Sequence, residues 1–339
     1  MVEQQPRLRA KIIYNPESGD KMQKAASAMQ YAQRLREEHN WEVDVEATRR
    51  SRHAIELAKE AALDGVNVVF AMGGDGTANE VARGLLRSKT ALAILPEGTV
   101  NIGARALKVP RDPIEAIDSY VQGNIHTIDV GAIVTREKGS TIYGNIFLFI
   151  ADLGHVGRAI NGIHEPGKKR KKSGVIPNIV EGVRQLPHAE TPSSVINIDG
   201  ENTSVQHLVQ VFVQNTPDLS FISGVRPDAQ FDNGQLAITI YSGKHESPKS
   251  NVLALARSLT GKLIGLRRPS PNETQRNGRR IIIASESPLY GDFDGEPLGS
   301  GVEREFFVMP DALRMLVPKS EEVDIFSRPG IPLIPSVVH

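Results

Sequence analysis

The sequence predicts two domains of different fold class: an α/β domain, doubly wound around a mainly parallel sheet, and an all-β domain built as an antiparallel sandwich. Up to about residue 130, apolar strand-like runs alternate with helical stretches, an order typical of a parallel sheet covered by helices. Beyond it, β-branched residues alternate with polar ones between short turns, which favours antiparallel strands. A length of 339 residues accommodates both domains.

The elements follow from these patterns in chain order. In the first domain the predicted strands are residues 11–14, 41–48, 66–70 and 91–95, and the predicted helices are residues 21–39 and 53–64. In the second domain the predicted strands are residues 195–198, 205–213, 236–241 and 280–284. The first two of these are joined by Asp199-Gly200, a dipeptide that favours a hairpin turn.

The most informative segment is residues 71–80, AMGGDGTANE, which lies between a buried strand and a helix. Backbone N–H groups and the positive end of a helix converge at such a turn and bind phosphate. Three glycines surround Asp75, more than a simple strand-to-helix turn needs. The spacing excludes a dinucleotide fingerprint, because Asn79 replaces its third glycine, and no GxxxxGK[ST] motif occurs. We predict phosphate binding by Gly73, Gly74, Gly76, Thr77 and Asn79.

The same segment allows a structural interpretation. Thr77 and Glu80 have the spacing of a capping box, in which two side chains satisfy the free N–H groups at a helix start. A capping box explains these two residues but does not explain the glycines, so both interpretations of Thr77 remain open.

Two further strand-to-helix turns resemble the first. Residues 15–19, NPESG, follow the first strand, and residues 96–101, PEGTVN, follow the fourth. Asn-Pro and Ser-Gly are ordinary turn formers, so each turn alone is a weak signal. The carboxyl ends of parallel strands, however, meet at one edge of the sheet. We therefore expect Asn15, Gly19 and Gly98 to join the phosphate site.

Six segments, in order, give the chain a resemblance to the soluble diacylglycerol kinase catalytic-domain family. They are NPESG, GGDGTANEV, LPEGTVN, YGNIFLFIADLG, PDAQFDNGQLAI, and DFDGEPLG with the following EFFVMPDALRMLVP. The family includes bacterial lipid kinases, which the chain resembles most, and is related to sphingosine kinases and NAD kinases. The resemblance implies an NAD-kinase-like nucleotide-binding domain over residues 1–130, to which residues 306–330 return, and a lipid-substrate domain over residues 131–305.

The resemblance also implies the reaction: transfer of the γ-phosphate of ATP, with Mg²⁺, to the hydroxyl of diacylglycerol or a similar lipid. Such a reaction needs a general base near the acceptor hydroxyl. Asp-Gly-Glu occurs twice, ending at Glu201 and at Glu296, and spacing alone does not choose between the two. The family pattern implies Glu296 as the base, with Asp294 supporting the base or the metal. Asp75 lies within the phosphate turn, where a bare carboxylate would repel phosphates, so we interpret it as a contact to Mg²⁺ or to the acceptor hydroxyl, with an Asx-type turn as the alternative.

Further residues are implied by the family alone. Thr48 and Thr99 match threonines that contact the nucleotide, although Thr48 also suits a helix cap. Asp152 resembles the acidic position through which sphingosine kinases hold the amino-alcohol head, and a buried strand-end aspartate is an equally good interpretation. A structural Mg²⁺ loop is matched by Gln230, Asn233 and Gln235.

Two positions depart from the family pattern. Asn233 replaces the expected aspartate of the metal loop, and an amide oxygen is a weaker ligand for Mg²⁺ than a carboxylate. Asp232 beside it is an alternative ligand, and a hairpin turn without metal is as good an interpretation. Ile102 replaces an aspartate that usually follows the GTxN segment. Together with Asp152, this substitution favours the alternative of a kinase for sphingoid bases or other amphipathic alcohols. A nucleotide-binding regulator that has lost turnover is a separate alternative, against which the retained Glu296 argues.

Composition favours a cytoplasmic enzyme. The 40 basic and 40 acidic side chains cancel, so no global attraction to nucleic acid is expected. Neither an apolar run of about 20 residues nor a cysteine occurs, which argues against a spanning helix and a disulfide framework. The run Lys168, Lys169, Arg170, Lys171 and Lys172 could contact anionic lipid at the inner membrane face, or be a solvated loop. A homodimer is left open.

Overall fold

The computed structural model describes residues 7–17, 21–98, 101–137, 140–158, 190–216, 229–244, 247–263, 272–319 and 325–333. The chain divides into two compact units. The first unit comprises Met1–Ile128 and Asp311–His339, and the second unit comprises Asp129–Pro310. Among the helices in the described ranges, none combines the length and apolar character needed to cross a membrane.

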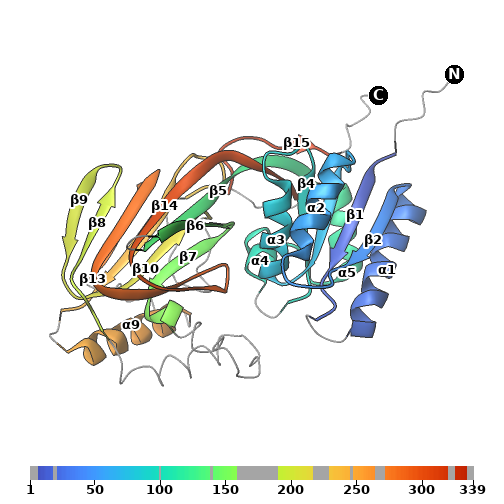
Figure 1. The fold of residues 1–339 in the computed structure, drawn as a ribbon. Helices are drawn as coiled ribbons and strands as arrows, with labels where there is room; N and C mark the ends of the chain where they lie inside the picture. Colours follow the sequence, from blue (N-terminus) through green and yellow to red (C-terminus); the bar gives the residue numbers. More distant parts are fainter. Residues whose placement is uncertain are drawn as a thin grey trace. The chain divides into compact units, whose positions relative to one another are not determined.

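Strands and helices alternate along the first unit (Figure 1). In order they are β1 (Arg9–Tyr14), α1 (Lys21–His39), β2 (Glu42–Ala47), α2 (His53–Leu63), β3 (Val68–Gly73), α3 (Asp75–Leu85), β4 (Ala91–Pro96), α4 (Ile102–Ala106) and α5 (Pro113–Val121). The strands lie in the order β2-β1-β3-β4, all parallel. The end of β14 (Glu296–Val317) lies parallel beside β4, and β15 (Ile331–Pro332) pairs with the start of β5 (Asn124–Glu137).

Helices cover both faces of this sheet, because α1 packs with α5 and α2 packs with α3 (Figure 1). The central strand β3 is buried along its whole length. On α3, Ala78, Val81, Ala82 and Leu85 are buried, the three- and four-residue spacing of a helix with one apolar face. A Cβ atom at Gly84 would lie 2.5 Å from the carbonyl oxygen of Ile55, so the close packing of α2 on α3 depends on this glycine.

Antiparallel strands form the second unit. They are β6 (Ser140–Phe147), β7 (Ile150–Gly154), β8 (Ser194–Ile198), β9 (Glu201–Val205), β10 (Leu208–Gln214), β11 (Leu236–Ser242), β12 (Glu273–Gly278) and β13 (Arg280–Phe293), with one helix, α9 (Pro248–Leu263). The order is β12-β11-β10-β7-β13-β14, with β8 beside β13 and β9 beside β8. Their inward side chains form one apolar core that includes Phe147, Leu153, Val211, Ile238, Ile281 and Phe306.

The observed elements confirm the predicted fold class, a mainly parallel α/β region followed by antiparallel strands. The predicted helices coincide with α1 and α2 to within one residue. The single strand predicted over residues 205–213 is wrong, because β9 ends at Val205 and β10 begins at Leu208. Between them His207 has a positive φ of 53°, a conformation that interrupts a strand and that a histidine does not reveal in the sequence.

Candidate active site

Two glycine turns meet at the carboxyl edge of the parallel sheet. The first turn follows β3 and the second follows β4. A Cβ atom at Gly98 would lie 2.6 Å from the Cα atom of Gly74, so the two backbones approach more closely than any side chain would allow. Gly74 is also the N-cap of α3 and has no side chain to cap the helix. A glycine turn directly before a helix is also the arrangement of phosphate-binding turns.

The capping box is not formed. Helix α3 begins at Asp75, so Thr77 is its third residue and not its N-cap. The side chain of Thr77 is buried over Gly73, where a Cβ atom would lie 2.6 Å from the hydroxyl oxygen. Glu80 instead accepts a hydrogen bond from the backbone N–H of Arg52 at 2.9 Å. The alternative interpretation of Thr77 is therefore wrong, and the first turn keeps its phosphate-binding interpretation.

Asp75 joins the first turn to the start of α4. Its Oδ1 accepts a hydrogen bond from the backbone N–H of Gly103 at 3.1 Å, and the N–H of Ile102 also donates to this carboxylate. Burial raises the pKa of Asp75, while these N–H groups oppose the rise. The side chain of Ile102 is 5% exposed. Position 102 therefore contributes its backbone to the carboxylate and its side chain to the core.

The remaining described nucleotide-site candidates lie in the same unit. Asn15 donates its N–H to the carbonyl oxygen of Met72 at 3.3 Å, and Thr48 donates its N–H to Tyr14 at 2.8 Å. Asn79 is buried in α3. The structure thus brings together at this edge Asn15, Thr48, Gly73, Gly74, Gly76, Thr77, Asn79 and Gly98. The predicted Gly19 and Thr99, and the basic run 168–172, lie outside the described residues.

Glu296 follows a two-residue turn between β13 and β14. The turn residues Asp294 and Gly295 have φ values of 46° and 84°, and Phe293 pairs with Glu296 across it. The Asp294 side chain is directed inward and the residue is 3% exposed. It accepts three backbone N–H hydrogen bonds, from Leu148, Phe149 and Ile150 at 2.7, 3.0 and 3.1 Å. Asp294 therefore anchors the hairpin that carries the partly exposed Glu296.

Asp152 lies inside the strand pairing of the second unit. It is the register partner of Asp292 across β7 and β13, and each residue is 3% exposed. The two carboxyl groups are hydrogen-bonded, and Gln210 Nε2 donates to Asp152 Oδ1 at 3.1 Å. Burial raises the pKa of Asp152 to about 6. Two buried carboxyl groups in contact share a proton more readily than both ionise.

The predicted structural metal loop is a hydrogen-bonded turn. Asn233 Oδ1 accepts from the N–H of Gln235 at 3.1 Å, and Asp129 Oδ2 accepts from the N–H of Gly234 at 2.6 Å. Nowhere in the described ranges do three His, Cys, Asp or Glu residues form a group that could hold a metal. These oxygens are hydrogen-bonded within the turn, and the Gln230 side chain offers an amide oxygen, so a metal held by Gln230, Asn233 and Gln235 stays a prediction.

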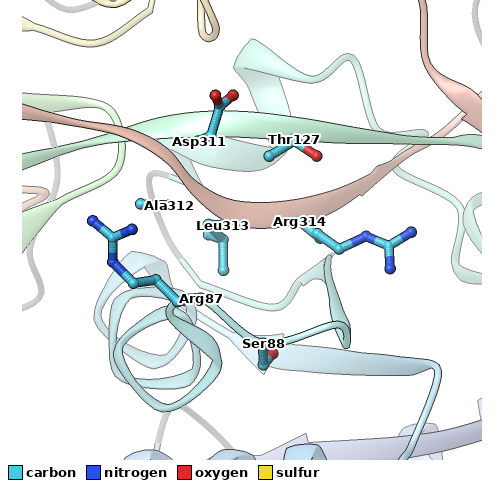
Figure 2. Close-up of a pocket in the computed structure, with 7 residues that line it drawn as sticks. All are labelled: Arg87, Ser88, Thr127, Asp311, Ala312, Leu313 and Arg314. Atoms are coloured by element: carbon cyan, nitrogen blue, oxygen red, sulfur yellow. The ribbon is translucent and has the colours of Figure 1, made fainter.

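A pocket of about 240 Å³ lies elsewhere in the first unit. Figure 2 shows its lining residues, Arg87, Ser88, Thr127, Asp311, Ala312, Leu313 and Arg314. The Arg87 and Arg314 guanidinium groups extend to opposite sides of Leu313, and Arg314 Nη1 donates to the carbonyl oxygen of Lys89 at 2.8 Å. The pocket contains none of the predicted site residues, and its cations do not converge.

Sequence reasoning missed a charged cluster beneath the second glycine turn. Lys24 and Tyr31 of α1 both contact Glu97, the residue before Gly98. The sequence did contain a signal for this cluster. Lys24 and Tyr31 are seven residues apart and so share one face of a helix, and Glu97 lies within the predicted turn 96–101.

A doubly wound sheet with glycine turns at the carboxyl ends of its strands is the architecture of a nucleotide-binding α/β protein. Residues 9–133 match the model of the diacylglycerol kinase catalytic domain. A diacylglycerol kinase of Bacillus subtilis strain 168 is 29% identical over 93% of this chain and 99% of its own length. One from Staphylococcus aureus strain JH9 is 28% identical over 86% of each chain.

The fold agrees with solved structures. The crystal structure of a diacylglycerol kinase from Bacillus anthracis strain Sterne superposes with a TM-score of 0.64 at 20% identity, covering 93% of this chain and 98% of that chain. A second structure from the same strain gives a TM-score of 0.69 at 22% identity, over 91% and 97%. These matches confirm the predicted resemblance to the diacylglycerol kinase catalytic-domain family, and the named relatives indicate a kinase phosphotransferase. Kinases of this family use a nucleotide and typically a divalent metal.

Proposed function

We propose that this protein transfers the γ-phosphate of ATP to the hydroxyl group of diacylglycerol, giving phosphatidic acid and ADP. The acceptor oxygen forms the new bond to phosphorus, the bond from phosphorus to the ADP oxygen breaks, and Glu296 accepts the hydroxyl proton. The observation that carries the proposal is the close backbone approach of Gly74 and Gly98 at the start of α3, which suits a polyphosphate.

The nucleotide is assigned to the turns of the first unit. The residues that would hold ATP are Asn15, Gly19, Thr48, Gly73, Gly74, Gly76, Thr77, Asn79, Gly98 and Thr99. Mg²⁺ is commonly held by one or two carboxylates together with substrate phosphates, and Asp75 is the carboxylate within the phosphate turn. When bound, the ion would spread the charge of the transferring group.

The acceptor is assigned to the second unit, through Glu296 and the Asp294 that anchors its hairpin. Diacylglycerol is favoured over an amino alcohol because Asp152, the predicted contact for an amino head, is buried against Asp292. A basic run at 168–172 would add attraction to an anionic membrane surface.

The experiment is transfer of labelled phosphate from ATP with Mg²⁺ to diacylglycerol, monoacylglycerol, sphingosine and ceramide in mixed micelles. Label in diacylglycerol that disappears in Glu296→Gln and persists in the matched control Glu201→Gln supports both the reaction and the base. Label only in sphingosine would transfer the assignment to a sphingoid-base kinase. If no lipid is labelled although ATP binds, the lipid-kinase proposal fails.

A further inference from the structure

Glu97 is the junction of the nucleotide turns. Its N–H donates to the carbonyl oxygen of Gly73 at 3.0 Å, and its own carbonyl oxygen accepts from Lys24 Nζ at 2.9 Å. Its carboxylate accepts a second hydrogen bond from Lys24 and one from the Tyr31 hydroxyl at 3.2 Å. One residue thereby links the end of β3, the turn after β4 and helix α1.

The partners of Glu97 come from one face of α1. Lys24 and Tyr31 are seven residues apart, and Ala28 between them is fully buried. Burial and the Glu97 carboxylate raise the pKa of Tyr31, so its hydroxyl keeps the proton that it donates. Lys24 is only 8% exposed, and the Glu97 side chain is 19% exposed. Little water reaches the ion pair, which is an environment in which an unmatched charge acts strongly.

We propose that Lys24 is a positioning residue that neutralises Glu97 and holds it away from the phosphates of ATP. This inference rests on the proposed function, because Glu97 directly precedes Gly98 of the nucleotide turn. A carboxylate at this position repels a polyphosphate unless a cation is paired with it. Lys24 supplies that cation and, through the Glu97 carbonyl oxygen, also fixes the backbone that leads into the turn.

A purely structural ion pair makes a different prediction from a charge-neutralising one. Lys24→Met and Glu97→Gln both break the same pair, so a structural role predicts similar losses and no recovery in the double variant. If neutralisation matters, Lys24→Met leaves a bare carboxylate beside the nucleotide, whereas Glu97→Gln leaves a cation that does not repel phosphate. The double variant then recovers most of the affinity lost in Lys24→Met.

The measurement is the Kd of a non-hydrolysable ATP analogue with Mg²⁺, obtained by titration calorimetry on the full chain at low and high NaCl. We expect Lys24→Met to weaken binding about tenfold or more at low salt and less at high salt, because ions screen the repulsion. Glu97→Gln and the double variant should stay within about threefold of the unaltered protein. Lys24→Arg keeps the positive charge and should bind the analogue like the unaltered protein. If Lys24→Met does not fold, the arginine variant still tests whether the charge is sufficient.

Equal losses in Lys24→Met and Glu97→Gln would overturn the inference, as would a double variant that binds as weakly as Lys24→Met. Loss of binding in Lys24→Arg as large as in Lys24→Met would do the same. If the unaltered protein binds the analogue but labels no lipid, the proposed function fails while this inference stands. If the unaltered protein does not bind the analogue, both fail.

Discussion

Two hairpins of the second unit have the same sequence, Asp-Gly-Glu, and the same turn, yet different surroundings. The first hairpin joins β8 to β9 through Asp199-Gly200, with φ values of 50° and 98°. The second joins β13 to β14 through Asp294-Gly295, with φ values of 46° and 84°. Two consecutive positive φ values are typical of the tight turn that Asp-Gly favours between antiparallel strands. Local sequence therefore determines the turn in both places.

The aspartates of the two turns make parallel hydrogen bonds in different environments. Asp199 accepts from the N–H groups of Arg279 and Arg280 and is exposed. Asp294 accepts from three N–H groups of the segment before and at the start of β7, and is 3% exposed. The turn therefore has the same backbone shape in both places, whereas the neighbouring backbone decides whether its aspartate is buried or exposed.

The largest expected difference between the hairpins is catalytic. Glu296→Gln removes the proposed proton acceptor and should lower kcat by about 100-fold to 10,000-fold. Glu201→Gln makes the same chemical change after the same turn and should leave kcat unchanged, because Glu201 is exposed on the edge strand β9. Phosphate transfer to diacylglycerol at saturating ATP measures both. A comparable fall in the two variants would show that the base has been assigned to the wrong place.

The next difference is in stability. Asp294→Asn keeps a residue that tolerates positive φ but replaces one acceptor oxygen with a donor facing buried N–H groups, which should cost about 3 kcal/mol of unfolding free energy. Asp199→Asn makes the same replacement where water can solvate the freed groups, and should cost less than about 1 kcal/mol. Urea unfolding followed by circular dichroism compares the two. Equal midpoints would mean that the burial of Asp294 contributes nothing.

The two Asp-Gly-Glu hairpins show how much of the structure the sequence could predict. The turn chemistry predicted a hairpin at Asp199-Gly200, and the alternation of elements predicted the parallel sheet of the first unit. Choosing between Glu201 and Glu296 required the family resemblance. The partners that distinguish Asp294 are backbone groups of Leu148, Phe149 and Ile150, about 145 residues away in the chain, and backbone groups leave no trace in residue type.

The same limit applies in the first unit. The order of strands and turns predicted that the turns after β3 and β4 meet at one edge of the sheet, and Gly74 does approach Gly98. Phosphate binding by the glycines around Asp75 stays a prediction. The sequence could not predict that Asp75 bonds the backbone of Ile102 and Gly103, because any residue at those positions offers the same N–H.

A third difference lies two residues before each turn. Asp292 is buried against Asp152 before the second hairpin, whereas the half-buried Asn197 stands at the matching position before the first. Because burial raises the pKa of Asp152 from 3.8 to about 6, the folded state holds its proton more tightly than the unfolded chain does. Its stabilising contribution is complete below about pH 4 and is lost as pH rises towards about 6, a change of about 3 kcal/mol at most.

Asp152→Asn removes this titration, so the pH dependence of unfolding between pH 4 and about 6 should become flatter. The matched control is Asn197→Asp, which places a carboxyl group at the equivalent position of the first hairpin. It should add no comparable slope, because Asn197 is partly exposed and bonds only to neutral groups, Asn202 and the Gly200 N–H. Thermal unfolding midpoints across this pH range provide the measurement. An unchanged slope in Asp152→Asn would show that the pair does not retain its proton.

The smallest expected effect tests what the hairpins share. Gly200 and Gly295 have φ values of 98° and 84°, and a Cβ atom at either would meet no heavy atom within 4 Å. An alanine at each position should therefore lower the free energy of unfolding only through its strained backbone conformation, by about 1 to 2 kcal/mol, and the two losses should be equal. Unequal thermal shifts in Gly200→Ala and Gly295→Ala would mean that the strands beside the second hairpin hold the turn itself as well as its side chains. Equal shifts would confine the difference between the hairpins to the buried side chains of Asp294 and Asp292 and to Glu296, the proposed base.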